Sequence, residues 1–155
     1  MRRLLAVLSL AALYACGGAA ANDETPVAAV RHFLEVMDRS VVDERALQEA
    51  YRLLDRQAQA ALTERAERAS TLAGRRFEPW QMLAQGRFRL RFAPATPGGM
   101  RERVEGERAF VTVSGSREGQ RAEVPLVREQ GRWRIALPIP IMRPAPAPAD
   151  PPREG

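Results

Sequence analysis

A chain of 155 residues is the length of one domain, so we expect a single hydrophobic core. The formal charge is +5, and its 24 basic residues, all arginine, are interleaved with 19 acidic residues. So mild an excess is not typical of a nucleic-acid-binding protein, and we predict no nucleic-acid partner. The single cysteine excludes an intramolecular disulfide.

Residues 1–15 have the pattern of an export signal. Arg2 and Arg3 supply positive charge ahead of an apolar run. This run has about 11 residues, whereas a helix needs roughly 20 to remain as a membrane span. It ends in Leu-Tyr-Ala-Cys, which resembles the box of a bacterial lipoprotein signal. The resemblance implies cleavage between Ala15 and Cys16 and lipidation of the Cys16 thiol.

A lipidated Cys16 implies a protein whose partner is a membrane, reached through its lipid anchor. Each buried acyl CH₂ contributes about 0.8 kcal/mol, so two or three chains hold a protein stably. We therefore expect localisation in the cell envelope, outside the cytoplasm. Gly17 favours the periplasmic side of the outer membrane if the host is Gram-negative. The alternative is free secretion after cleavage behind Ala21. Residues 16–25 are small and polar, as a tether requires.

The folded part is expected to begin with a helix. Thr25 is a good N-cap, and Pro26 suits the first helical position. Apolar residues then recur at helical spacing and give the helix one apolar face. These residues are Val27, Val30, Phe33, Leu34 and Met37.

A second helical region is expected from Asp43, an N-cap residue, to Gly74, a residue that commonly ends helices. Its apolar positions continue without a break in helical spacing. A short helical turn at 79–84 places Trp80 and Leu83 for packing on the core.

From residue 87 the apolar period changes from helical to two. Phe88, Leu90 and Phe92 alternate with arginines, which predicts a strand over 87–92 with one buried face. Pro-Gly-Gly at 97–99 predicts a turn. Three further strands, joined by short hairpin connections, are expected at 109–114, 121–128 and 133–137. Helices followed by an antiparallel meander indicate the α+β class.

The first helix, at 26–34, and the closing hairpin, Val-Arg-Glu-Gln-Gly-Arg-Trp-Arg-Ile at 127–135, resemble the nuclear-transport-factor-2-like, or cystatin-like, lipoprotein domains of bacteria. In this hairpin a glycine supplies the turn and Trp133 packs on the core. The resemblance covers residues 26–138. It implies N-terminal helices packed on a curved antiparallel sheet of about four strands, often with a conical pocket. It implies a shape rather than an activity, because one fold carries many functions.

The chain ends in a Pro- and Ala-rich segment at 139–155. Seven of the 12 prolines fall between residues 138 and 152. We predict a solvated disordered tail. The alternatives are an extended polyproline spacer and a ligand for a proline-reading partner.

The implied pocket has few candidates for catalysis. The residues that we assign to it are aromatic, namely Tyr51, Trp80, Phe88 and Phe92. The apolar faces of the predicted strands carry no acid or base, so a catalytic group would have to come from the helices. The helical candidates are His32, Asp38, Tyr51 and Asp55. His32 falls away from the apolar helix face, which favours a surface or boundary position.

We therefore expect a non-enzymatic binding or interaction domain for a hydrophobic small molecule, a lipid or another envelope protein. The alternative is an isomerase or dehydratase of the same superfamily, with Tyr51 and either Asp55 or Asp38 in the pocket. The chain has one histidine and shows no Gly-rich phosphate loop, nucleophile elbow or zinc motif. We predict no cofactor and no metal site. The pattern indicates no particular oligomeric state.

Two sets of arginines raise the prospect of a basic patch. Arg87, Arg89 and Arg91 share one side of a predicted strand, and Arg132 and Arg134 share one side of another. If these strands are close, the patch would suit anionic lipid headgroups or an acidic partner. We expect instead a solvated face with weak cross-strand pairs to Glu123 and other acids.

Overall fold

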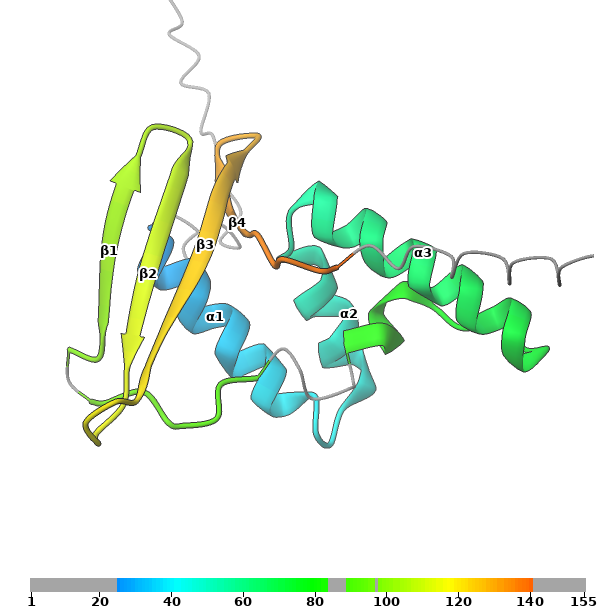
Figure 1. The fold of residues 1–155 in the computed structure, drawn as a ribbon, viewed down its shortest axis with the longest axis horizontal. Coiled ribbons are helices and arrows are strands. Elements are labelled where there is room, and N and C mark those ends of the chain that lie inside the picture. The colour runs from blue at the N-terminus through cyan, green and yellow to red at the C-terminus, as the bar shows by residue number, and fades with distance from the viewer. Residues whose placement is uncertain (1–24, 84–88, 97, 141–155) are drawn as a thin grey trace, which may run out of the picture.

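The computed structural model describes residues 25–83, 89–96 and 98–140 (Figure 1). The predicted signal peptide, Cys16 and all of the tail beyond residue 140 lie outside these residues. The elements in chain order are α1 (Pro26–Arg39), α2 (Glu44–Arg52), α3 (Arg56–Ala73), the 3₁₀ helix η2 (Pro79–Leu83), β1 (Met100–Glu105), β2 (Arg108–Ser114), β3 (Arg121–Glu129) and β4 (Arg132–Ile135).

The four strands form one antiparallel sheet in the order β1-β2-β3-β4. In its register Val111 lies opposite Glu102 on one side and Val124 on the other, and Leu126 lies opposite Ile135. The predicted hairpins therefore form, and the α+β class is confirmed.

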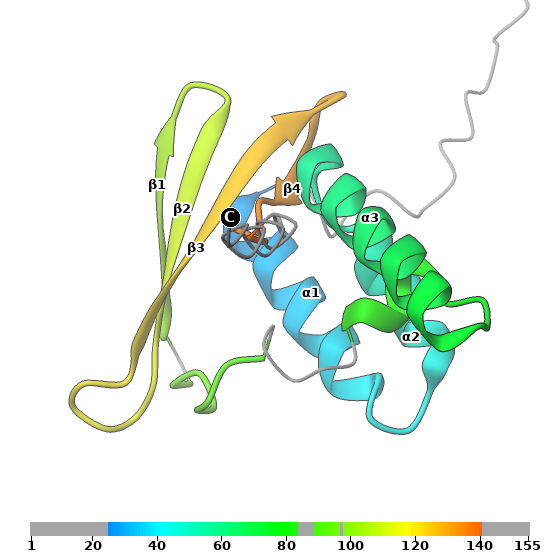
Figure 2. The same ribbon diagram turned by 45° about the vertical axis from the view of Figure 1, so that its right-hand side comes forward.

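The molecule has three layers, which are the sheet, then α1, then α2 with α3 (Figures 1 and 2). The sheet turns its inner face towards α1. In β2, Ala109, Val111 and Val113 are buried, while the residues between them point to the outer face. The largest fully buried side chains are Met37, Leu54, Leu62, Leu83, Leu126, Ile135, Val30, Val36, Val111 and Val113. The core therefore lies on both sides of α1.

The predicted helix starts are confirmed by their caps. The Thr25 hydroxyl accepts a hydrogen bond from the Ala28 N–H at 3.1 Å, and Pro26 occupies the first helical position. The Asp43 carboxylate accepts from the Arg45 N–H at 2.9 Å. Such caps need only residues close in sequence, which is why the local pattern predicts them correctly.

The prediction of one helical region from residue 43 to residue 74 is wrong in its middle. The chain leaves helical structure after Arg52 and starts α3 at Arg56, with Asp55 as the new N-cap. The intervening segment pairs with β4. The Asp55 N–H donates to the Ile135 carbonyl, and the Ile135 N–H donates to the Leu53 carbonyl, both at 3.0 Å. Pairing with a strand about 80 residues away interrupts a helix that the local apolar period favours.

The strand predicted at 87–92 is not found in its described part. Residues 89–93 are bends that cross the end of α1, and the first bridge to the sheet is Pro94 to Gly115. Leu90 and Phe92 pack against the core without a ladder of hydrogen bonds. Phe88 lies outside the described residues. Two apolar side chains that pack at the edge of the core, with the exposed Arg91 between them, therefore give a period of two without a strand.

The sheet's first strand is instead β1, which the sequence analysis did not predict. Its inner-face residues are Met100, Glu102 and Val104, so a charge interrupts the apolar alternation. Because β1 is an edge strand, most of its side chains are exposed. An edge strand of this kind has no strong apolar signal.

Candidate ligand-binding cleft along helix α1

A cleft runs along α1 where residues 89–96 and 98–100 cross the helix. One part has a volume of about 530 Å³ and the other about 320 Å³, and both are lined by Leu34, Asp38 and Pro94. Because the two parts share these residues, we treat them as one site and call it the α1 cleft. The remaining lining residues of the larger part are Arg31, Glu35, Ala95, Thr96, Gly98, Gly99 and Met100.

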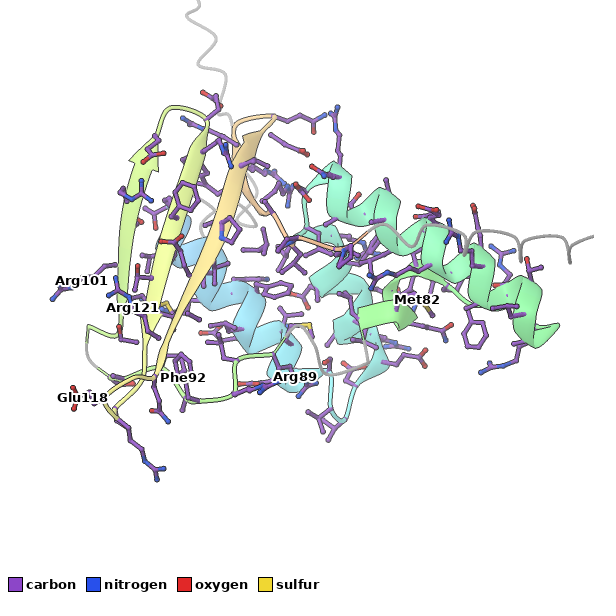
Figure 3. The ribbon with its side chains drawn as sticks, viewed as in Figure 1. Met82, Arg89, Phe92, Arg101, Glu118 and Arg121 are labelled. Atoms are coloured by element: carbon purple, nitrogen blue, oxygen red, sulfur yellow. The ribbon has the colours of Figure 1, made fainter. Side chains whose placement is uncertain are left out.

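The smaller part of the α1 cleft has an apolar floor. Leu34 and Met37 of α1 face Leu90 and Phe92 of the crossing segment. Arg89 closes this end, where its guanidinium donates to the Ser40 hydroxyl at 2.9 Å (Figure 3). A cation at the C-terminal end of a helix is favoured by the helix dipole. The floor therefore suits an apolar group, and a charged rim surrounds it.

The structure separates the three described aromatic residues among the four that the sequence assigns to one pocket. Phe92 lines the α1 cleft, and Phe88 lies outside the described residues. Trp80 belongs to η2, which packs against α2 and α3, well away from Phe92 (Figure 3, where Met82 marks η2). Tyr51 is half-buried, and its hydroxyl lies 3.3 Å from the Thr63 hydroxyl of α3.

Side chains occupy the space between the sheet and α1, where the family resemblance implies a conical pocket. Trp133 is only 6% exposed, and Val111, Val113 and Ile135 have no exposed surface. The prediction that Trp133 packs on the core is confirmed. The open volume lies beside α1 instead.

Three of the four catalytic candidates on the helices, His32, Tyr51 and Asp55, have structural partners. The Asp55 carboxylate, 6% exposed, accepts a hydrogen bond from the Ala58 N–H at 2.8 Å. Burial raises the pKa of Asp55, the bond from Ala58 opposes this effect, and the nearby Glu129 charge adds to it. Asp38, by contrast, is exposed and lines the α1 cleft.

His32 lies half-buried at the boundary between α1 and α2. Its Nε2 lies 3.0 Å from Glu49 Oε1, and Arg39 donates to Glu49 Oε2 at 2.7 Å. The three side chains link the two helices and border a second, polar cleft of about 540 Å³. The boundary position predicted for His32 is confirmed.

The described arginines do not form the basic patch that was the alternative to a solvated face, because residues 89–91 are not a strand. Arg89 reaches the end of α1, whereas Arg134 on β4 donates to the Arg52 carbonyl at 3.0 Å. Arg91 is exposed, and Arg87 lies outside the described residues. The two sets of arginines are therefore not on neighbouring strands.

One wall of the α1 cleft was missed by the sequence analysis. It is formed by Pro94, Ala95, Thr96, Gly98, Gly99 and Met100, whereas the sequence predicts only a turn in this segment. The available signal was the cluster of Pro94, Gly98 and Gly99, because loops of this composition often carry binding residues. Composition alone does not show that the loop folds over α1.

Comparisons with protein families, curated protein sequences and solved structures found no match to this chain. Over the described ranges, no helix has the length and apolar character to cross a membrane. Within the same ranges, no three His, Cys, Asp or Glu side chains gather as a metal site would require. The case for a function therefore depends on the α1 cleft and on the sequence of the N-terminal segment.

Proposed function

We propose that this chain is an envelope lipoprotein, anchored through Cys16, whose domain binds a hydrophobic small molecule or lipid in the α1 cleft without catalysing a reaction. We further propose that the domain has the cystatin-like fold. Two features support this fold: α1 packs across one face of an antiparallel meander, and the 127–135 hairpin carries a buried Trp133.

The observation that carries the proposal is the composition of the α1 cleft. Small-molecule sites commonly have volumes of about 300–1,000 Å³ and mostly apolar linings with a few polar groups. Both parts of the cleft fall in this range, and Leu34, Met37 and Phe92 supply apolar surface. Burying such surface against an apolar ligand contributes about 25 cal/mol per Å². Charges of both signs on the rim, such as Arg31 and Glu35, suit a ligand with a polar end.

Binding is favoured over catalysis because two of the candidate catalytic groups are engaged within the fold. Asp55 caps α3, and Tyr51 contacts α3 through its hydroxyl. Asp38 lines the cleft, but the isomerase or dehydratase hypothesis needs a partner for it. Neither Tyr51 nor Asp55 lines the α1 cleft, so neither is that partner.

Nile red, a neutral apolar dye, tests the cleft. The full chain should bind the dye saturably with a blue shift in its emission. Leu34→Trp fills the cleft and should abolish this binding. Leu72→Trp is the matched control, because Leu72 on α3 is 88% exposed, and it should bind as the wild type does. Equal binding by both variants, at equal thermal stability, would remove the α1 cleft as the site.

The mass of the protein purified from membranes tests the anchor. A chain that starts at Cys16 and carries acyl groups is the expected result, and Cys16→Ser should abolish the acyl mass. A chain that starts at Asn22 without acyl groups would replace the lipoprotein with a secreted protein. This outcome leaves the cleft hypothesis intact, because Nile red binding is measured separately.

A further inference from the structure

A third cleft lies on the outer face of the sheet, at the end where β2 meets the loop that leads to β1. Its volume is about 290 Å³. Strand register places Arg101 opposite Thr112 and Arg121 opposite Ser114, so the two arginines flank β2 from β1 and β3. All four side chains line this outer-face cleft, and Figure 3 shows both arginines at the same end of the sheet.

The two arginines of the outer-face cleft have no acidic partner among the described residues, where the ion pairs lie elsewhere. Arg103, two residues along β1, differs because it pairs with Glu105 and lies over the Phe110 ring. Glu123 stands opposite Thr112 but forms no ion pair with either cleft arginine. The outer-face cleft is therefore lined by two exposed arginines that form no ion pair, beside the hydroxyl groups of Thr112 and Ser114.

The wall of the outer-face cleft is held firmly against β2. The Ala95 N–H donates to the Ser114 carbonyl at 2.8 Å, and the Ser114 N–H donates to the Gly99 carbonyl at 2.7 Å. Gly99 is buried, and a Cβ there would collide with the Ala95 backbone and lie 2.9 Å from the Ser114 carbonyl oxygen. A wall fixed in this way reduces the entropy lost when a ligand binds.

We propose that the outer-face cleft binds a phosphate group. Arginine offers several N–H donors in a planar fork that matches phosphate oxygens, and its bonds to anions are the strong, charge-assisted kind. Two arginines with two hydroxyls supply donors from more than one direction, which fits a tetrahedral dianion better than a flat carboxylate. The phosphate belongs either to a soluble phosphomonoester or to a lipid headgroup. This site does not depend on a ligand in the α1 cleft.

Inorganic phosphate is the first probe. Titrating it into the ¹⁵N-labelled full chain should shift the amide signals of Thr112 and Ser114 saturably. Hydrogen bonds to charged groups contribute about 1.5–3 kcal/mol, so Arg101→Gln and Arg121→Gln should each weaken binding by about tenfold or more. Arg132→Gln is the control, because it removes the same charge from an exposed position on β4.

Three results would overturn the phosphate site. The first is that phosphate causes no saturable shifts in the wild type. The second is that Arg101→Gln and Arg121→Gln bind phosphate as tightly as the wild type does. The third is that Arg132→Gln weakens phosphate binding as much as the two cleft variants do. The last result would indicate a general charge effect. Preserved amide spectra in the variants show that they fold, so weaker binding cannot be ascribed to unfolding.

Two further probes separate the sources of the phosphate. Glycerol 3-phosphate and dihexanoyl phosphatidic acid carry the same phosphomonoester, but only the second has acyl chains. Equal affinities would assign the site to a soluble phosphomonoester. Tighter binding of the phosphatidic acid, lost in Arg101→Gln, would assign it to a lipid headgroup. Failure of both probes to compete with inorganic phosphate would overturn the assignment to phosphomonoesters.

Discussion

Asp55 gives the sharpest test of the energetics, because its two structural roles respond differently to two substitutions. Its carboxylate caps α3 by accepting the Ala58 N–H at 2.8 Å, at the point where the chain pairs with β4. Asp55→Ala removes this acceptor and leaves the N–H buried without a partner. Loss of an N-cap costs about 0.5–2 kcal/mol. With a urea m-value of about 1–3 kcal/mol/M, the unfolding midpoint should fall by roughly 0.2–2 M.

Asp55→Asn, unlike Asp55→Ala, should not lower the stability of the domain. Asparagine caps helices as well as aspartate does, so the bond to Ala58 is retained. The helix dipole favours a negative charge here by about 0.3–1 kcal/mol, but burial is the largest influence on this carboxyl and it disfavours the charge. We expect Asp55→Asn to be at least as stable as the wild type at neutral pH.

The pH dependence has a definite sign. The pKa of Asp55 is raised in the folded state above its ordinary value of 3.8. Protonated Asp55 therefore stabilises the folded state, and this stabilisation is fully present below pH 3.8 and is lost as the pH rises through the folded-state pKa. The free energy of unfolding of Asp55→Asn, relative to that of the wild type, should therefore increase between pH 3.8 and the folded-state pKa and stay constant at higher pH. If Asp55→Asn is as unstable as Asp55→Ala at neutral pH, the charge stabilises the cap and this reasoning is refuted.

Two more predictions concern the sheet. Trp133→Ala removes a side chain that is 6% exposed and should cost about 3–5 kcal/mol, enough to unfold much of the domain; an unchanged thermal midpoint would contradict its place in the core. Gly99→Ala forces the backbone at Ala95 or Ser114 to move, at a cost of about 1–3 kcal/mol. Hydrogen exchange of the Ser114 amide, which donates to Gly99, should then accelerate. Unchanged exchange would show that the wall accommodates a methyl group without moving.

Local sequence patterns predicted the parts of this fold that depend on neighbouring residues. The caps at Thr25 and Asp43 satisfy N–H groups two or three residues away, so residue type is sufficient to identify them. The three later strands follow from period-two alternation. Gly74 ends α3 in the left-handed conformation, at φ 63°, which glycine adopts without the steric cost of a Cβ.

The binding surfaces were much less predictable. Tyr51, Trp80 and Phe92 look equivalent in sequence, as aromatic residues in apolar surroundings. The fold places Phe92 on the α1 cleft but directs the Tyr51 hydroxyl at α3. Arg101 and Arg121 are 20 positions apart, and only the register of β1, β2 and β3 brings them to one cleft.

The sequence by itself determined the α+β class, the starts of the first helices, the meander of the last three strands and the expectation of an anchor at Cys16. Tertiary structure alone decided the break at Asp55, the edge strand β1 and the path of residues 89–96 and 98–100 over α1. The physical reason is the range of the interactions. Caps and apolar periods arise from residues within a few positions, whereas pairing with Ile135 or crossing α1 depends on partners brought close only by folding.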